Sequence, residues 1–266
     1  MVRKAFTLYQ LFNCHCTVIN STIMSRNSLV FVFVPPHEHM TIYYCSLSDA
    51  SHWIISNQHF LYSTSVQPLR IETVNHHAIP DYLTTRGYNH IGDIDCFEDI
   101  IYGGIEGGDS SGYLAKWNAT DLTFLSATET ELHGVPWVAV DYDQREIYAA
   151  NWNDCCEFSI YSIDDFHFLR TLTVSNMPAE IQGSAFYQGD LYVSSNINVS
   201  VHKIDVTTGE TTFVLSDDYI EKHLYEMEGL TFWDLEERQQ GPGLGTMHLF
   251  GNFMEVKEKA IRNFKV

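Results

Sequence analysis

The sequence predicts an all-β fold, a β-propeller built from four-stranded antiparallel blades. One observation is a recurring unit of an apolar strand, a tight turn and a second strand that begins with an aliphatic–Tyr pair or a close equivalent. The other is that two further strands follow most copies of this unit before the next copy begins. Strand-filled periods of roughly 40–50 residues are typical of propellers. We expect five blades, with six as the alternative, in a single domain over residues 28–266.

The second strand of each unit fixes the period. In the first clear unit, a strand over residues 90–95 precedes a turn and then Ile101-Tyr102. The matching strands begin at Ile147, Leu191 and Met247, so the successive steps are 46, 44 and 56 residues. An earlier copy is predicted to start at Trp53.

Third and fourth strands complete each blade. They are predicted over residues 112–118 and 122–125, 158–164 and 166–169, and 201–205 and 212–215. Each third strand ends in Asn or Asp, whose side chains favour turns by bonding the backbone ahead of them. Residues 28–34 are predicted to form the outer strand of the last blade, which would close the ring.

The first 27 residues differ from the rest of the chain. They begin with Arg3-Lys4, but Gln10, Asn13 and His15 interrupt the apolar stretch that a secretion signal requires. We therefore expect residues 1–27 to be an atypical N-terminal segment that is disordered or acts in targeting. No apolar run is long enough to predict a membrane span.

Charge restricts the partners. The chain has 15 basic and 34 acidic residues, which gives a net charge of −19. Such a surface argues against nucleic acid and anionic lipid as partners, and it suits either a bound cation or simple solvation. We expect a small-molecule ligand or substrate, with a protein partner as the alternative.

Three Asn-x-Ser/Thr sequons, at Asn20, Asn118 and Asn198, indicate a secreted or lumenal glycoprotein, with the cytoplasm as the alternative. The six cysteines lack the spacing of a zinc site. Cys155-Cys156 is compatible with a vicinal disulfide or with two thiols.

Polar residues should converge at one end of the ring, because the starts of first strands and the ends of second strands lie together in a propeller. The predicted catalytic residues are His90, Asp93 and Glu106, and the predicted ligand-binding residues are Trp137, Gln182 and Asn252. An imidazole in such a ring suits a general base. Carboxylate and amide oxygens around an axis suit calcium.

Two short words resemble a known family. Glu-Gly-Leu-Thr-Phe-Trp over residues 228–233 and Pro-Trp-Val-Ala-Val-Asp over residues 136–141 resemble blade-opening segments of gluconolactonase/paraoxonase-type calcium-dependent propellers. The resemblance implies a divalent cation, calcium, held by Glu228, with Asn151 and Asn196 as amide ligands. Glu-Gly-Leu-Thr is also similar to a word in propeller-type glutaminyl cyclotransferases.

Two functions remain open at this stage. In one, the chain is a metal-dependent hydrolase of lactone- or ester-like substrates, and His90 with Asp93 or Glu106 moves protons. In the other, it is a non-enzymatic propeller that binds a protein or a small molecule. Each site residue also has a structural alternative: a buried histidine bonded to backbone for His90, turn formation for Asn151 and Asn196, and core packing for Trp137.

Overall fold

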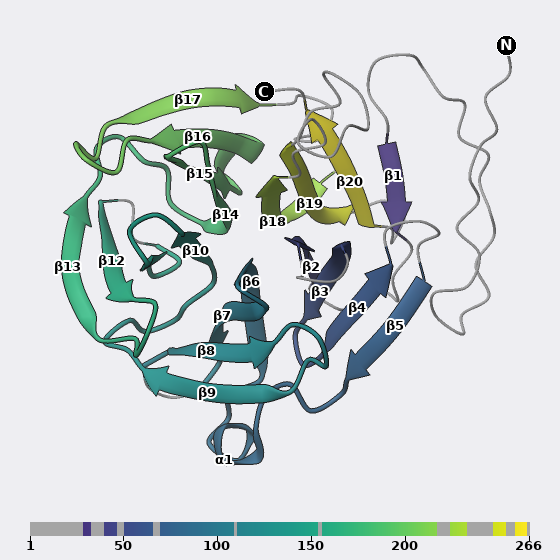
Figure 1. Cartoon of the computed structure of the whole chain (residues 1–266). Coiled ribbons are helices and arrows are strands. Elements are labelled where there is room, and N and C mark those ends of the chain that lie inside the picture. The colour runs from purple at the N-terminus through teal and green to yellow at the C-terminus, as the bar shows by residue number, and fades with distance from the viewer. Residues whose placement is uncertain are drawn as a thin grey trace, which may run out of the picture.

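The computed structural model describes residues 29–32, 40–46, 51–65, 70–108, 111–153, 156–216, 224–232, 247–253 and 259–264. Within these ranges the strands pair into five four-stranded antiparallel sheets (Figure 1). Four of the sheets each consist of consecutive strands. The fifth joins a strand from near the start of the chain to three strands from its C-terminal part.

The consecutive sheets have the following strands. The first contains β2 (Met40–Ser46), β3 (Ser51–Asn57), β4 (Leu61–Ser65) and β5 (Arg70–Asn75). The second contains β6 (His90–Phe97), β7 (Ile100–Glu106), β8 (Tyr113–Asn118) and β9 (Phe124–Glu129). The third contains β10 (Val138–Asp141), β11 (Glu146–Ala149), β12 (Glu157–Ser162) and β13 (Phe168–Thr173). The fourth contains β14 (Ile181–Tyr187), β15 (Asp190–Ser195), β16 (Ser200–Ile204) and β17 (Thr211–Ser216).

The remaining sheet closes the ring. It consists of β18 (Leu224–Phe232), β19 (Met247–Phe253), β20 (Lys259–Phe264) and β1 (Leu29–Val32). The backbone of β1 pairs antiparallel with β20, with Leu29 opposite Arg262 and Val32 opposite Lys259. The predicted outer strand near residues 28–34 is therefore confirmed.

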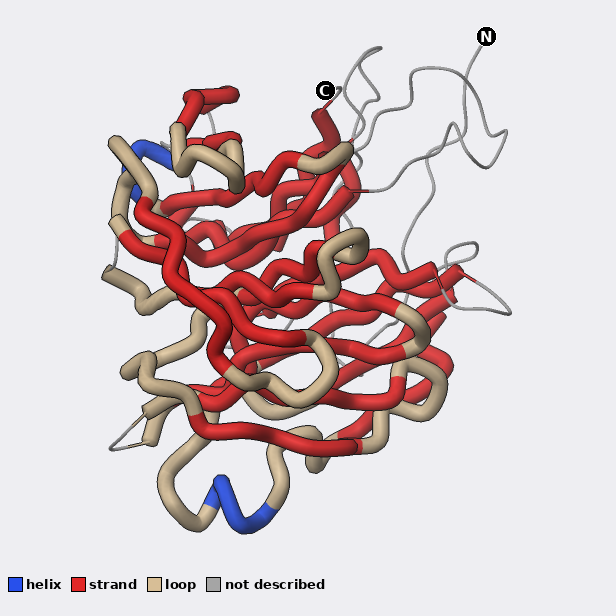
Figure 2. The backbone as a smooth tube through the Cα atoms, turned by 60° about the vertical axis from the view of Figure 1, so that its left-hand side comes forward, coloured by secondary structure: helices blue, strands red, loops and turns tan. Residues whose placement is uncertain are grey.

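The first strand of every sheet lies at the centre of the ring (Figure 1). The inner strands β2, β6, β10, β14 and β18 each contact the next, and β18 contacts β2. The all-β arrangement of four-stranded antiparallel sheets around an axis is thus as predicted. Figure 2 shows a short helix, α1 (Asp81–Thr84), in a loop that projects beyond the strands.

One blade was placed wrongly in the sequence prediction. Trp53 lies in β3, the second strand of its sheet, and β2 supplies the first strand. The turn after β3 has the same signals as a turn between first and second strands. Its Asn57 Oδ1 accepts hydrogen bonds from the N–H groups of His59 and Phe60, at 3.0 and 2.7 Å. Local turn chemistry therefore does not reveal which pair of strands a turn joins.

The outer strands share an irregularity. In each of the four consecutive sheets, the register between third and fourth strands shifts by one residue. The residues left without a cross-strand partner are Glu72, Leu125, Leu169 and Val214. Such β-bulges bend a strand and interrupt its ladder of hydrogen bonds.

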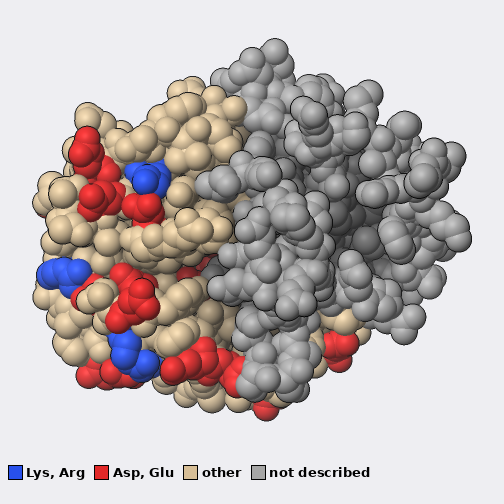
Figure 3. Space-filling model, turned by 45° about the horizontal axis from the view of Figure 1, so that its top comes forward, with Lys and Arg blue, Asp and Glu red and all other residues tan. Residues whose placement is uncertain are grey.

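Surface charge agrees with the composition. Figure 3 shows acidic side chains interspersed with basic ones on the described part of one face. Some of these charges form exposed pairs, such as Arg145 with Asp164 at 2.7 Å. Exposed pairs of this kind contribute little to stability. No helix among the described residues is long and apolar enough to cross a membrane.

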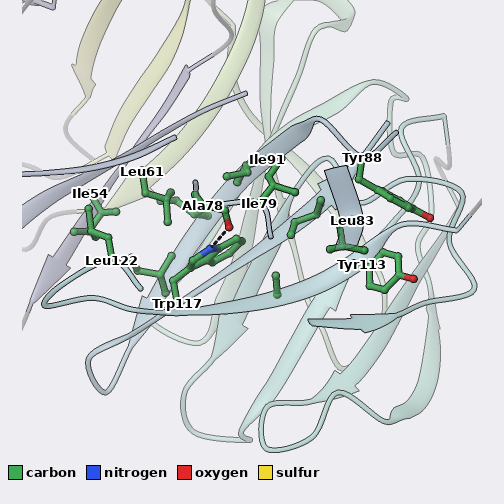
Figure 4. Packing of buried hydrophobic residues seen from close by; sticks show 14 of the residues in the cluster. Ile54, Leu61, Ala78, Ile79, Leu83, Tyr88, Ile91, Tyr113, Trp117 and Leu122 are labelled. Atoms are coloured by element: carbon green, nitrogen blue, oxygen red, sulfur yellow. Dashed lines mark hydrogen bonds between the residues drawn. The ribbon is translucent and has the colours of Figure 1, made fainter. Parts of the chain in front are cut away.

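The core lies largely between neighbouring sheets. One cluster joins Ile54 and Leu61 of the first sheet to Ile91 and Trp117 of the second. The connection between these sheets, residues 76–89, contributes Ala78 and Leu83 to the same cluster (Figure 4). The Trp117 indole donates from Nε1 to the Ala78 carbonyl at 2.8 Å. The indole therefore satisfies its one polar group while its ring fills the seam between sheets.

Candidate functional site

The structure brings together two of the three predicted catalytic residues. His90 begins β6, Glu106 ends β7, and the two are directly opposite in the antiparallel pairing. The His90 Nδ1 atom lies 2.7 Å from Glu106 Oε1, and the side chains are 24% and 20% exposed. An ionised carboxylate only accepts hydrogen bonds, so Nδ1 donates and Nε2 is the basic nitrogen of the neutral ring. The pair is an orienting acid and a base within reach of solvent.

Asp93 lies deeper, between inner strands. A bulge places Gly92 and Asp93 opposite a single residue of β7. The Asp93 side chain is 1% exposed, and its Oδ2 accepts a hydrogen bond from the Ser184 N–H of β14 at 2.9 Å. Its Oδ1 is buried and has no hydrogen-bond partner among the described residues. Asp93 therefore links two sheets across the centre of the ring, which sequence analysis did not predict.

Burial raises the pKa of Asp93 well above its ordinary value. The Ser184 N–H opposes this rise by stabilising the charged form, and the nearby Asp95 carboxylate adds to it by repulsion. Asp95 is itself fully buried and accepts from the Val140 N–H of β10 at 2.7 Å. Two carboxyl groups on one strand thus bind backbone groups of two other sheets.

The raised pKa of Asp93 predicts a pH-dependent stability. Its ordinary pKa is 3.8, so between that pH and the higher folded-state pKa the folded chain binds more protons than the unfolded chain. The contribution of Asp93 is therefore complete below that pH and is lost as pH rises. Asp93→Asn, a neutral isostere, should gain on the wild type by up to about 1.4 kcal/mol per pH unit over this interval. Urea unfolding of both proteins at pH 4, 6 and 8 measures the difference, and a difference independent of pH would contradict the prediction.

Gln182 and Glu228 occupy bulges similar to that of Asp93. The register skips Gln182 between Ile181 and Gly183 of β14, and it skips Glu228 between Met227 and Gly229 of β18. Both side chains are buried, at 6% and 3% exposure. Bulges often redirect a side chain near a functional site. A polar residue next to Gly at the start of a first strand was the signal in the sequence that these positions share.

Glycine permits the inner strands to approach closely at these bulges. A Cβ atom added to Gly183 would lie 2.5 Å from the Gly229 carbonyl carbon, and one added to Gly92 would lie 2.4 Å from the Pro136 oxygen. These distances are shorter than any real Cβ contact. The glycines therefore hold neighbouring first strands together and fix the bulged side chains beside them.

Asn151 and Asn196 have the structural role that was their alternative. The Asn151 Oδ1 accepts from the N–H groups of His133 and Gly134, at 2.7 and 3.4 Å. The Asn196 Oδ1 accepts from the Met227 N–H at 2.6 Å. Both amide oxygens predicted to face a cation face backbone donors instead. No group of three or more His, Cys, Asp or Glu among the described residues is arranged to hold a metal ion.

Two predicted ligand-binding residues remain to be placed. Trp137 is fully buried, and its ring packs edge-on against Phe158 with centroids 5.1 Å apart. It belongs to the core, so the prediction of a ligand contact at Trp137 is corrected. Asn252 lies in β19, where its backbone pairs with Glu226 and Lys259. Its side chain lies outside the described part of the chain.

Cysteine chemistry differs from the sequence prediction. Cys96, at the end of β6, is disulfide-bonded. Sequence analysis considered only the neighbouring pair at residues 155 and 156. Of that pair, Cys155 lies outside the described residues and Cys156 is exposed. Spacing along the chain gave no signal for a bond at Cys96, because disulfide connectivity depends on the fold.

No protein-family model matches the sequence, and no curated protein matches it. Solved structures do match. A glutaminyl cyclase from Myxococcus xanthus aligns with a TM-score of 0.60 at 13% identity, over 90% of this chain and 97% of the other. The chain has the β-propeller fold. A structure of a nidogen/laminin complex matches this propeller with a TM-score of 0.52 at 12% identity, over 81% and 71% of the two chains. Sqt1 of Saccharomyces cerevisiae aligns with a TM-score of 0.44 at 10% identity, over 82% and 56%.

Proposed function

We propose that this propeller is a hydrolase of lactone- or ester-like small molecules and that the His90–Glu106 pair is its acid–base group. The supporting observation is the 2.7 Å contact between Nδ1 and Oε1 at the end of the ring where first strands begin. Both side chains are partly exposed, so a bound substrate can reach them. A base oriented by a carboxylate is the usual arrangement for activating a water or hydroxyl nucleophile.

The proposed reaction is hydrolysis at an acyl carbon. His90 Nε2 removes a proton from water as its oxygen bonds to the carbonyl carbon, and Glu106 stabilises the resulting imidazolium through Nδ1–H. The carbon–oxygen bond of the leaving alcohol then breaks, and His90 returns the proton to that oxygen. The products are a carboxylic acid and an alcohol, which remain one molecule when the substrate is a lactone.

The bulged side chains are the proposed ligand contacts. Gln182 and Glu228 follow the same device on neighbouring inner strands, and both lie near the starts of those strands. Gln182 supplies an amide that can both donate and accept. We assign Gln182 to substrate binding and place Glu228 beside it, so that Trp137 has no part in the site.

Calcium is a separate element of the proposal. Glu228 supplies a carboxylate, but the amide oxygens of Asn151 and Asn196 accept backbone hydrogen bonds, so this set does not fit an ion cage. We derive no reaction step through a metal. Thermal unfolding with EDTA, followed by added calcium, measures the requirement directly. With this ligand set we expect no selective calcium shift, whereas native-state binding at a hundredfold excess would contribute about 2.7 kcal/mol.

Amide chemistry is the second candidate, because one structural neighbour is a glutaminyl cyclase whose whole chain aligns with this propeller. Attack on a glutaminyl side-chain carbonyl also needs a proton acceptor and donor at an acyl carbon. A non-enzymatic role is the third, because another neighbour was solved in a protein complex, the nidogen/laminin complex. We place the chain in a secreted or lumenal compartment, which the disulfide at Cys96 supports.

A substrate panel tests the proposed function. Purified protein is incubated with γ- and δ-lactones, p-nitrophenyl esters and peptides that begin with glutamine, with and without EDTA. Turnover of lactones or esters that survives EDTA is the expected result. Turnover of the glutamine peptides alone would favour the cyclase candidate. No turnover of any substrate would leave the binding propeller as the better account.

A further inference from the structure

We propose that Gly134 and Asn151 form a support that positions the Glu106 carboxylate against His90 and so sets the tautomer of the imidazole. The inference rests on the proposed function for its catalytic meaning, but its geometry stands independently. Gly134 lies in the loop that enters β10, and Asn151 follows the end of β11. Neither residue contacts His90 in the proposal; both act through Glu106, as positioning residues.

Gly134 leaves the space that the carboxylate occupies. A Cβ atom added to Gly134 would lie 2.6 Å from Glu106 Oε2 and 3.7 Å from its Cδ. The other oxygen, Oε1, is the one that lies 2.7 Å from His90 Nδ1. The carboxylate therefore spans the gap between the Gly134 backbone and the imidazole. Any side chain at position 134 would compete for the place of Oε2.

The loop that carries Gly134 is held from two sides. Asn151 Oδ1 accepts from the N–H groups of His133 and Gly134, which ties the loop to the end of β11. On the other side, the Val135 carbonyl oxygen lies 1.8 Å from where a Cβ of Gly104 would be. Gly104 is two residues before Glu106 on β7. The loop is thus fixed relative to the same strand that carries the carboxylate.

The support has a chemical consequence. While Oε1 accepts from Nδ1–H, the proton of the neutral imidazole stays on Nδ1 and Nε2 remains the base. A displaced carboxylate loses this acceptor contact, so the proton is no longer held on Nδ1. A fixed tautomer is what separates a general base from a histidine that merely lies near the site.

Gly134→Ala is a direct test. Gly134 does not have a left-handed backbone, and the atom that an alanine meets is the far end of a flexible side chain. The fold should therefore survive while the carboxylate moves. Nitrogen-15 NMR of imidazole-labelled protein reports the tautomer of His90, whose signals are assigned by their loss in His90→Ala. We expect the Nδ1–H form to lose population, with a fall in turnover of about 10²-fold.

Two controls define the route of the effect. In a Glu106→Ala background, Gly134→Ala should cause no further change at His90, because the two residues act through one contact. Asn151→Ala should loosen the loop and shift the tautomer in the same direction, whereas Asn151→Asp keeps an accepting oxygen and should restore it. If Gly134→Ala does not fold, this pair of Asn151 variants decides the question.

The outcomes separate this inference from the proposed function. An unchanged His90 tautomer in folded Gly134→Ala, or an effect that persists without Glu106, overturns the positioning role even if the enzyme turns over. A shifted tautomer in a protein that hydrolyses nothing in the panel keeps the support and rejects the hydrolase.

Discussion

Replacing Trp117 with alanine is expected to lower the free energy of unfolding by about 3–5 kcal/mol. The side chain is fully buried in the cluster that joins the first and second sheets (Figure 4). The substitution opens a large cavity in that seam. It also removes the Nε1 donor that satisfies the Ala78 carbonyl at 2.8 Å, which leaves a buried acceptor unpaired. Chemical denaturation followed by tyrosine and tryptophan fluorescence measures the loss.

Two matched substitutions isolate the cause. Trp117→Phe keeps most of the ring but not the hydrogen bond, so its cost should fall between those of the wild type and Trp117→Ala. Phe168→Ala removes an aromatic ring that is 54% exposed on β13 and should change stability by no more than about 0.5 kcal/mol. A cost below about 1 kcal/mol for Trp117→Ala would mean that the seam between these sheets repacks freely.

His90→Ala is expected to reduce hydrolysis of lactones or esters by about 10²–10⁴-fold while the fold persists. The side chain is partly exposed and begins its strand, so its removal leaves no deep cavity. The loss should appear mainly in kcat, because proton transfer is made only in the transition state. Steady-state kinetics and a thermal melt on the same preparation measure the two effects together.

The chain offers a matched control for His90. His167 forms a similar pair, with Nδ1 lying 2.5 Å from Asp165 Oδ1, but it is exposed in the turn between β12 and β13. His167→Ala should leave turnover unchanged. Loss of folding in His90→Ala would instead identify His90 as a structural histidine. Equal loss of turnover in both variants would show that the assay does not report on the His90–Glu106 pair.

Much of the fold follows from periodicity alone. The second strands predicted at Ile101, Ile147 and Leu191 lie in β7, β11 and β15, because aliphatic–Tyr pairs after tight turns mark a buried strand wherever the blade recurs. The outer strand β1 was found by its apolar run and by the need to close the ring. The first blade was shifted by one strand because the turn at Asn57 resembles its counterparts in every local respect.

The site was predictable only in part. His90 and Glu106 could be paired because strand ends in one blade meet by rule. The roles of Asn151, Asn196 and Asp93 depend on backbone N–H groups supplied by other loops and other sheets, such as that of Ser184, 91 residues away from Asp93. No local pattern encodes such partners. Gly134 matters through what it lacks, and a glycine in a loop has many ordinary explanations.

The bulges of the outer strands have a consequence for how the protein behaves in concentrated solution. A straight edge strand is a template onto which another chain can add, and fibrils grow in this way. In the four consecutive sheets the edge is kinked once, and the apolar Leu125 and Leu169 sit at the kink with 48% and 40% of their surface exposed. Residues that would be adhesive on a flat ribbon are thus carried where no regular ladder can form. The rim of the ring resists growth at its edges without a single charged residue being needed at these two positions.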